Sequence, residues 1–424
     1  MLFLVAILLS VWFWRRNLKD SSFWMLATYA GVGLLFFTDY SVSASMNEAI
    51  PKIVQDFLLL GMVGLVQSLA VAKRIPVWVA VLITLGLFTA AHLISTEEPA
   101  FQGTSTETTE ATATLDPNGE YLVEVKEGTA GASFVAFAAQ QGWTIEQAFM
   151  PADKDATYLD NYYVVDVADQ SVAAAADILA NTSSVAYFEP NEIVQLEPMM
   201  SGEVSANKRN PSLSINDPET DQQWAMDVLN MEGYYKLLAK QTPLKKAKIA
   251  ILDTGVDSKH EDLKGNYFSV NRKYDDDPMG HGTHCAGIAA GVTNNNIGIA
   301  SLAGTGKQPF VEVTSIKVLS AGGMGTQKSI IAGIIEAADE GADVISLSLG
   351  GPSNSSRQKA YTQAVKYAIG EGAIVVAAAG NSNRDAKDYS PANATGMITV
   401  AAVDQNLKRA VFSNTVNNLK QGIG

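Results

Sequence analysis

Three short motifs in the second half of the chain contain side chains that can carry out acyl transfer. Asp253 opens an Asp-Thr-Gly motif after an apolar run, His281 lies in Gly-His-Gly-Thr-His, and Asn381 closes Ala-Ala-Ala-Gly-Asn. An Asp that orients a His, and an Asn that donates to an oxyanion, are parts that activate and stabilise such a reaction. The order Asp, His, Asn therefore indicates an acyl-transfer site that still needs a nucleophile.

The segments before these motifs have the pattern of buried parallel strands. Residues 249–252 and 373–379 are continuously apolar, as expected for strands that are covered on both faces. Asp253 and Asn381 would then follow the carboxyl ends of two strands, the edge at which α/β sheets bind ligands. His281 opens a helix-like stretch and is the candidate general base and general acid. The pattern predicts an α/β domain built on a parallel sheet.

At these residues the sequence resembles the subtilisin-like serine proteases, in which Asp, His and Ser follow one another along the chain. The resemblance covers residues 217–424 and implies a doubly wound parallel sheet. It also implies that Asp253 orients His281 and that Asn381 donates to the oxyanion. The implied activity is that of a serine endopeptidase that hydrolyses peptide bonds in proteins.

The family's serine lies in a Gly-Thr-Ser motif after the oxyanion Asn, and no such motif follows Asn381. The Gly-Thr-Ser that ends at Ser105 lies in low-complexity sequence without an apolar helix after it, so it is rejected as the nucleophile. We therefore expect a C-terminally truncated peptidase domain, inactive as written. The alternative is a catalytically inactive pseudo-protease or a membrane-bound inhibitor module.

The resemblance also implies two edges that hold an extended peptide substrate through main-chain hydrogen bonds. Residues 346–351 resemble the strand that runs antiparallel to the peptide, and residues 322–325 resemble the segment on its other side. The implied substrate-binding residues are Gly323, Ser348, Leu349, Gly350, Ala378 and Gly380.

A structural Ca²⁺ site is implied by residues 293–299, which resemble the calcium loop of the family. Side-chain and carbonyl oxygens with one or two carboxylates suit a hard cation. The implied ligands are Asp217, Asp262, Thr293, Asn295, Ile297 and Ile299.

Two other residues near His281 have chemical potential. His284 could pair with His281 around a metal ion, but no Glu lies between them and no third ligand is near, so zinc is disfavoured and His284 is interpreted as structural. Cys285 is the only cysteine, which excludes an internal disulfide, and it is interpreted as a small buried packing residue.

The first 95 residues predict a four-span transmembrane region. The apolar stretches are residues 1–14, 23–37, 53–72 and 76–94, and a span needs roughly 20 apolar residues. Arg15, Arg16, Lys19, Lys73 and Arg74 lie in two alternate loops, which the positive-inside rule places in the cytoplasm. This arrangement predicts a multi-pass protein of the bacterial cell envelope whose peptidase domain is extracytoplasmic.

A flexible linker over 96–118, rich in Thr, Glu and Ala, precedes a strand-helix-strand-strand-helix-strand pattern over 119–198. The predicted strands are 121–125, 143–149, 162–167 and 185–196, which is a ferredoxin-like α+β pattern. Its position before the peptidase domain resembles the family's inhibitory propeptide, which acts in cis. The segment 199–216 is then a linker with a processing site.

The net charge and the number of Asp-Thr-Gly motifs argue against two other classes, nucleic-acid-binding proteins and aspartic proteases. The formal net charge of −14 argues against nucleic acid as a partner. Asp-Thr-Gly also occurs in aspartic proteases, which pair two such aspartates, but the chain has one copy. An aspartic protease would also leave His281 and Asn381 without a role.

Overall fold

The computed structural model describes residues 60, 63, 66, 83 and 84 and the ranges 114–128, 130–154, 156–167, 171–196, 215–304, 309–353 and 358–419. The apolar stretches predicted to span a membrane lie outside these residues, apart from those five single positions. Most of the predicted linker over 96–118 and of the predicted processing segment also lies outside them. No helix in the described part of the chain is long and apolar enough to cross a bilayer.

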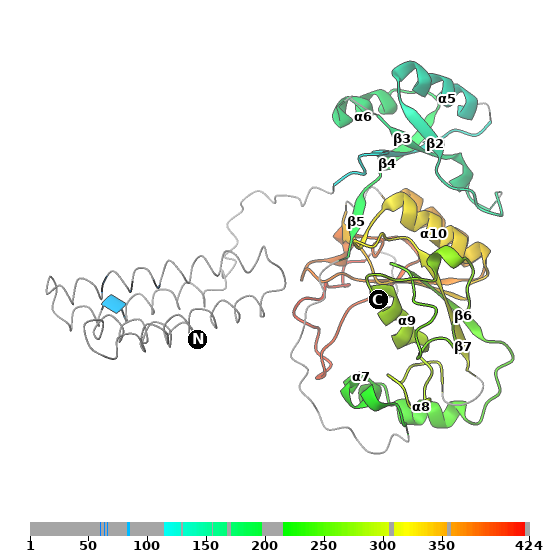
Figure 1. The fold of residues 1–424 in the computed structure, drawn as a ribbon. Helices are drawn as coiled ribbons and strands as arrows, with labels where there is room; N and C mark the ends of the chain where they lie inside the picture. Colours follow the sequence, from blue (N-terminus) through cyan, green and yellow to red (C-terminus); the bar gives the residue numbers. More distant parts are fainter. Residues whose placement is uncertain are drawn as a thin grey trace, which may run out of the picture. The chain divides into compact units, whose positions relative to one another are not determined.

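The described residues from 114 to 419 belong to one compact unit, which begins with a four-stranded antiparallel sheet. Figure 1 shows helices α5 and α6 on the same side of this sheet. The strand order is β2-β3-β1-β4, which matches the predicted ferredoxin-like pattern. The elements are β1 (Tyr121–Val125), α5 (Ala130–Gln141), β2 (Thr144–Gln147), β3 (Tyr162–Asp166), α6 (Val172–Ala180) and β4 (Val185–Pro190).

The single strand predicted over 185–196 is two strands. β4 ends at Pro190, after which Asn191 N still donates to Glu120 O at 2.8 Å. β5 (Ile193–Gln195) leaves the four-stranded sheet and pairs antiparallel with β8 (Met324–Thr326). The chain after Pro190 therefore joins the domain that follows it in sequence.

Both faces of β1 are covered, which explains why all five of its residues are buried. Tyr121 and Val123 pack in a cluster with Phe134 of α5 and Leu179 of α6. Leu122, which points to the opposite face, belongs to a cluster that contains residues of α10 (Gln327–Asp339) and α11 (Lys359–Gly370). The second face of this small sheet is therefore buried against two helices of the larger domain.

The larger domain contains a five-stranded sheet in which every pair is parallel, with the order β13-β11-β9-β6-β7. Its strands are β6 (Ala247–Asp253), β7 (Val311–Lys317), β9 (Val344–Leu347), β11 (Ile374–Ala378) and β13 (Ile398–Val400). The remaining helices and strands are α7 (Trp224–Val228), α8 (Met231–Leu238), α9 (His281–Ala290), β10 (Gly351–Pro352) and β12 (Tyr389–Ser390).

Helices cover both faces of this sheet. Ile251 of β6 packs in a cluster with Ala286 and Ala290 of α9. Its neighbours Ala250 and Leu252 belong to the cluster that holds α10 and α11. Because successive strand residues point to opposite faces, α9 lies on one face and α10 and α11 on the other. This arrangement confirms the predicted doubly wound α/β sheet.

Candidate active site

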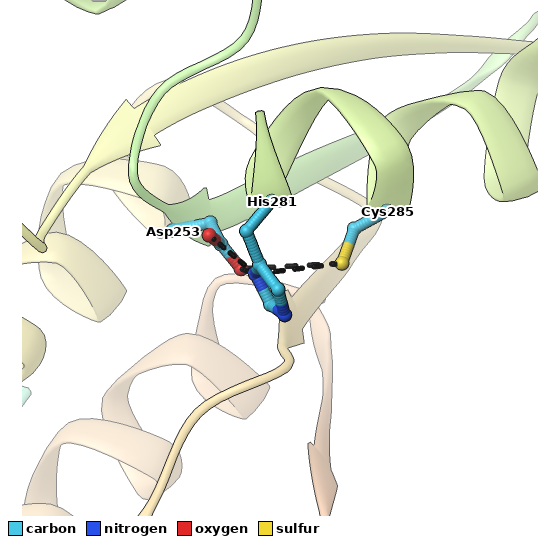
Figure 2. Close-up of side chains that lie close together, drawn as sticks. All are labelled: Asp253, His281 and Cys285. Atoms are coloured by element: carbon cyan, nitrogen blue, oxygen red, sulfur yellow. Dashed lines mark hydrogen bonds and ion pairs between the residues drawn. The ribbon is translucent and has the colours of Figure 1, made fainter. Parts of the chain in front are cut away.

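Asp253 and His281 form a hydrogen-bonded pair at the carboxyl edge of the parallel sheet. Asp253 is the last residue of β6 and is fully buried, and His281 is the first residue of α9. His281 Nδ1 lies 2.8 Å from Asp253 Oδ1 and 2.9 Å from Oδ2, and Figure 2 shows the ring directed at the carboxylate. Because an ionised carboxylate only accepts hydrogen bonds, Nδ1 carries a proton in both charge states of the ring, and in the neutral ring Nε2 is the basic nitrogen.

The hydrogen bond with Asp253 is the main cause that raises the pKa of His281 well above its ordinary value. The neighbouring Cys285 raises this pKa further, and partial burial of the ring opposes both effects. The site therefore stabilises the imidazolium, which is the form that a histidine takes after it accepts a proton.

Two glycines set the position of His281. Gly280 caps α9 with a φ of +84°, which an L side chain rarely adopts. At Gly282 a Cβ atom would lie 2.1 Å from the carbonyl oxygen of Gly255 and 3.0 Å from the Cβ of Asp253. The first turn of α9 therefore packs directly on the backbone that follows β6, which brings His281 within reach of Asp253.

Asn381 follows β11 at the same edge and is exposed. β9 lies between β11 and β6, so the ends of these two strands are separated by about 10 Å, or two strand spacings. Asn414, which is fully buried, holds the turn: its Nδ2 donates to Ala379 O at 2.8 Å, and its Oδ1 accepts from Ser382 N at 3.1 Å and Arg384 N at 2.8 Å. No local sequence pattern indicates this role for Asn414, because its partners are distant in sequence.

The two predicted peptide-binding edges both lie beside β5. The carbonyl of Gly323 accepts a hydrogen bond from Leu196 N at 2.9 Å, and β8, which follows Gly323, pairs with β5. Ser348, Leu349 and Gly350 follow β9 and lead into β10, which contacts β5. The side chain of Leu349 is buried in the hydrophobic cluster that contains residues of α10 and α11, which is the main core of the domain. Only the main chain of Leu349 would therefore be available to bind a peptide. Ala378 and Gly380 flank the turn that leads to Asn381.

The residues predicted to bind calcium are brought together around two buried carboxylates. Asp217 accepts from Asn294 N at 2.7 Å and Asn295 N at 2.9 Å, and Asp262 accepts from Asn295 Nδ2 at 2.8 Å and Ile299 N at 3.0 Å. Burial, with Asp217 as a like charge, raises the pKa of Asp262, although its hydrogen bonds oppose this. All four oxygens of the two carboxylates therefore accept hydrogen bonds from N–H groups of this loop. Thr293 and Ile297 belong to the same loop.

Cys285 lies closer to the reactive groups than its interpretation as a packing residue implied. Its Sγ is 4.0 Å from His281 Nδ1 and 4.0 Å from Asp253 Oδ2, as Figure 2 shows. Within the described ranges, one side-chain nitrogen, sulfur or carboxylate oxygen from each of Asp253, His281 and Cys285 lies within 4.8 Å of the other two. His284 is exposed and lies outside this group. The four-residue spacing of His281 and Cys285 was a signal for this proximity, because such residues share a helix face.

Fold and site together define an α/β domain of the doubly wound type, with a buried Asp that orients a His at the carboxyl edge of the sheet. Residues 245–423 match the model of the subtilase family of peptidases. These residues therefore form a subtilase-like domain.

Two curated relatives and one solved structure show the extent of the similarity. Thermitase from Thermoactinomyces vulgaris is 48% identical over 39% of this chain and 58% of that protein. Subtilisin DY from Bacillus licheniformis is 43% identical over 39% of this chain and 60% of that protein. The chain therefore spans about three fifths of the length of these relatives. An epidermin leader peptide processing serine protease from Staphylococcus aureus has a similar fold, with a TM-score of 0.50, 20% identity and coverage of 70% of this chain and 73% of that one.

Proposed function

We propose that residues 217–424 are part of a serine endopeptidase that cleaves peptide bonds in proteins. The observation that carries this proposal is the pair formed by the buried Asp253 and His281 Nδ1, which leaves Nε2 to take a proton from a serine hydroxyl. In this proposal His281 acts as general base and then as general acid. Asn381 donates to the oxyanion; loss of the corresponding donor in subtilisin, itself a member of this family, costs about 2.7–4 kcal/mol of transition-state stabilisation.

The serine is the missing part of the proposed triad, because no Gly-Thr-Ser motif follows Asn381 in the 424 residues. A triad without its nucleophile retains only the catalysis of the oxyanion hole and of binding. The test is to sequence the gene and its transcript past the codon for Gly424. An open frame that reaches Gly-Thr-Ser and a helix supports the proposal, and the His281→Ala variant of that longer product should then be inactive on casein.

A stop codon directly after Gly424 would contradict the peptidase proposal. The chain would then be better explained as a pseudo-protease or as an inhibitor module. A direct assay distinguishes these two: an inhibitor module should slow a subtilisin added in trans, and a pseudo-protease should not.

We further propose that residues 119–196 inhibit the peptidase domain in cis, as a zymogen propeptide does. β5 supports this proposal, because it pairs with β8 while Leu196 N donates to Gly323 O, the pattern of an extended peptide added to a sheet edge. Val194, in the centre of β5, is 3% exposed and lies in the main core. An occupied edge cannot bind substrate, so cleavage within residues 199–216 followed by release of this domain would activate the enzyme.

A second set of contacts supports the same proposal. Glu189 accepts from Gln327 Nε2 at 2.7 Å in α10, and from Lys359 N and Ala360 N, both at 3.1 Å, in the first turn of α11. Asn191 Oδ1 accepts from Lys328 N at 3.0 Å. Carboxylate and amide oxygens at helix N-termini satisfy N–H groups that have no partner inside the helix.

Two properties complete the proposed function. The apolar stretches within the first 95 residues anchor the protein in a lipid bilayer with the peptidase domain outside the cytoplasm; extraction of the protein from membranes at alkaline pH without detergent would contradict this. Asp217, Asp262, the side chain of Asn295 and nearby carbonyls hold a structural Ca²⁺ that links the loop to the rest of the domain.

A further inference from the structure

The loop that leads into α9 contains a carboxylate that the proposed mechanism does not use. Asp277 Oδ1 accepts a hydrogen bond from Thr254 Oγ1 at 2.8 Å. Asp277 Oδ2 accepts from Thr283 N at 2.9 Å and from Thr283 Oγ1 at 2.8 Å. Asp277 therefore joins the residue directly after Asp253 to the first turn of the helix that begins with His281.

The hydroxyl of Thr254 has one hydrogen and two carboxylates within reach. Its Oγ1 lies 2.8 Å from Asp277 Oδ1 and 3.2 Å from Asp253 Oδ1, and it also accepts from Gly282 N at 3.2 Å. The hydrogen goes to the nearer acceptor, Asp277, since the shorter contact is the stronger hydrogen bond. Asp253 Oδ1 then keeps two donors, Thr254 N at 2.7 Å and His281 Nδ1 at 2.8 Å.

The surroundings of Asp277 favour its ionised form. Partial burial raises the pKa of this carboxyl, but hydrogen bonds from Thr283, Thr254 and Gly280 outweigh burial and hold the pKa below its ordinary value. The loop is also packed tightly, because a Cβ at Gly255 would lie 2.1 Å from the carbonyl oxygen of Asp276.

We propose that Asp277 is a positioning residue: by accepting the Thr254 hydroxyl hydrogen it keeps that hydroxyl from competing with His281 for Asp253. A hydroxyl that donated to Asp253 would share the negative charge of the carboxylate and weaken its hold on the imidazolium. The inference rests on the proposed role of His281 as general base. It concerns the Asp253–His281 pair itself, so it can be measured without enzyme activity.

Replacing Asp277 by Asn tests the proposal. The amide oxygen can replace one carboxylate oxygen as the acceptor for Thr283, and the amide nitrogen then donates to Thr254 Oγ1, so the hydroxyl hydrogen must turn toward Asp253. The readout is the titration of His281 in the full chain with ¹⁵N-labelled histidine, where only four histidines contribute and the His281→Ala variant assigns the signal. Asp277→Asn should lower the proton affinity of His281 about tenfold, or about one pKa unit.

Thr254→Val supplies the matched control, because it removes the hydroxyl and keeps the shape of the side chain. The proposal predicts that Thr254→Val leaves the His281 titration unchanged and that Asp277→Asn has no further effect in that background. An unchanged titration in Asp277→Asn overturns the proposal, as does an equal shift in both backgrounds. Circular dichroism shows whether Asp277→Asn folds, and if it does not, Thr254→Val alone tests the proposal. A pKa of His281 that rises in Thr254→Val would mean that the hydroxyl of the native chain donates to Asp253, and this would overturn the proposal. Failure of the peptidase assay would refute the proposed function and leave this result untouched.

Discussion

Replacing Glu189 by Gln tests how strongly the 119–196 domain is held by a buried carboxylate. Glu189 is fully buried and faces Gln327, the first turn of α11 and the side chains of Tyr187 and Glu192. Burial raises the pKa of Glu189 to about 7, although the N–H donors of Ala360 and Lys359 oppose this shift. In the docked domain Glu189 therefore keeps its proton up to a higher pH than in a released domain, where Glu189 would lie in water.

The sign and size of the pH effect follow from this difference. A carboxyl whose pKa is raised in the docked state contributes stability that is complete below its ordinary pKa and is lost as the pH rises through the docked value. Between an ordinary pKa of 4.5 and a docked pKa of about 7, the loss amounts to about 3 kcal/mol. Docking should thus weaken by about two orders of magnitude between pH 4.5 and pH 8.

Hydrogen exchange measured by mass spectrometry on the full chain can detect this change. After correction for intrinsic exchange rates, amides in residues 185–196 and in the first turn of α11 should be better protected at pH 5 than at pH 8. In Glu189→Gln this difference should disappear, because Gln does not ionise, while amides in β11 serve as an internal reference. Glu146→Gln is the matched control: Glu146 pairs with Lys328 of α10, but its side chain is 62% exposed, so its removal should leave the pH dependence unchanged.

Two outcomes would refute the reasoning. If protection in the native chain is equal at pH 5 and pH 8, Glu189 is ionised in the docked domain and its hydrogen-bond donors fully offset its burial. If Glu189→Gln keeps the complete pH dependence, another group is responsible for it.

Three further predictions concern the larger domain. Gly282→Ala should destabilise the domain by about 1–3 kcal/mol, because the added methyl meets the carbonyl of Gly255; urea denaturation measures this, and an unchanged midpoint would contradict the close packing. Removal of Ca²⁺ by a chelator should lower the thermal midpoint of the native chain and have a smaller effect on Asp262→Asn; equal effects on both would argue against a site at Asp262. His281 should titrate well above the ordinary range of histidine in the folded chain and return to that range in urea, so the stability it contributes is complete below its unfolded pKa and is lost as the pH rises through the folded value.

The elements that carry Asp253 and His281 could be predicted because their signals are local. An apolar run ending in Asp253 and a glycine-flanked His281 that opens a helix are both visible within a few residues. Their contact then follows from the geometry of a parallel sheet, whose strand ends share one edge. The predicted strand 185–196 was wrong in its extent, because its last part, β5, pairs with β8, a distant segment that no local pattern indicates.

Residues that support the pair from a distance were not predictable in the same way. Asp277 and Asn414 are short polar residues in polar stretches, where a turn is the ordinary expectation. Their function depends on partners such as Thr254 and Ala379, which folding brings close and which no spacing pattern encodes. Only the structure shows that Asn414 is buried and that both its side-chain oxygen and its side-chain nitrogen form hydrogen bonds.

The two helices that pack on the 119–196 domain differ in how their first turns are satisfied. α10 caps itself, because Thr326 and Ser329 exchange hydrogen bonds with each other's backbone N–H groups. α11 begins after Gln358, whose side chain makes no capping hydrogen bond, and Glu189 is what accepts from Lys359 N and Ala360 N. The N-terminus of α11 therefore depends on a residue of the preceding domain. α10 combines its own capping box with acceptors from that domain, because Gln327 N donates to Glu192 O and Lys328 N donates to Asn191 Oδ1. If residues 119–196 act as the proposed inhibitor, their release would expose the first turn of α11 to water together with the edge that β5 occupies.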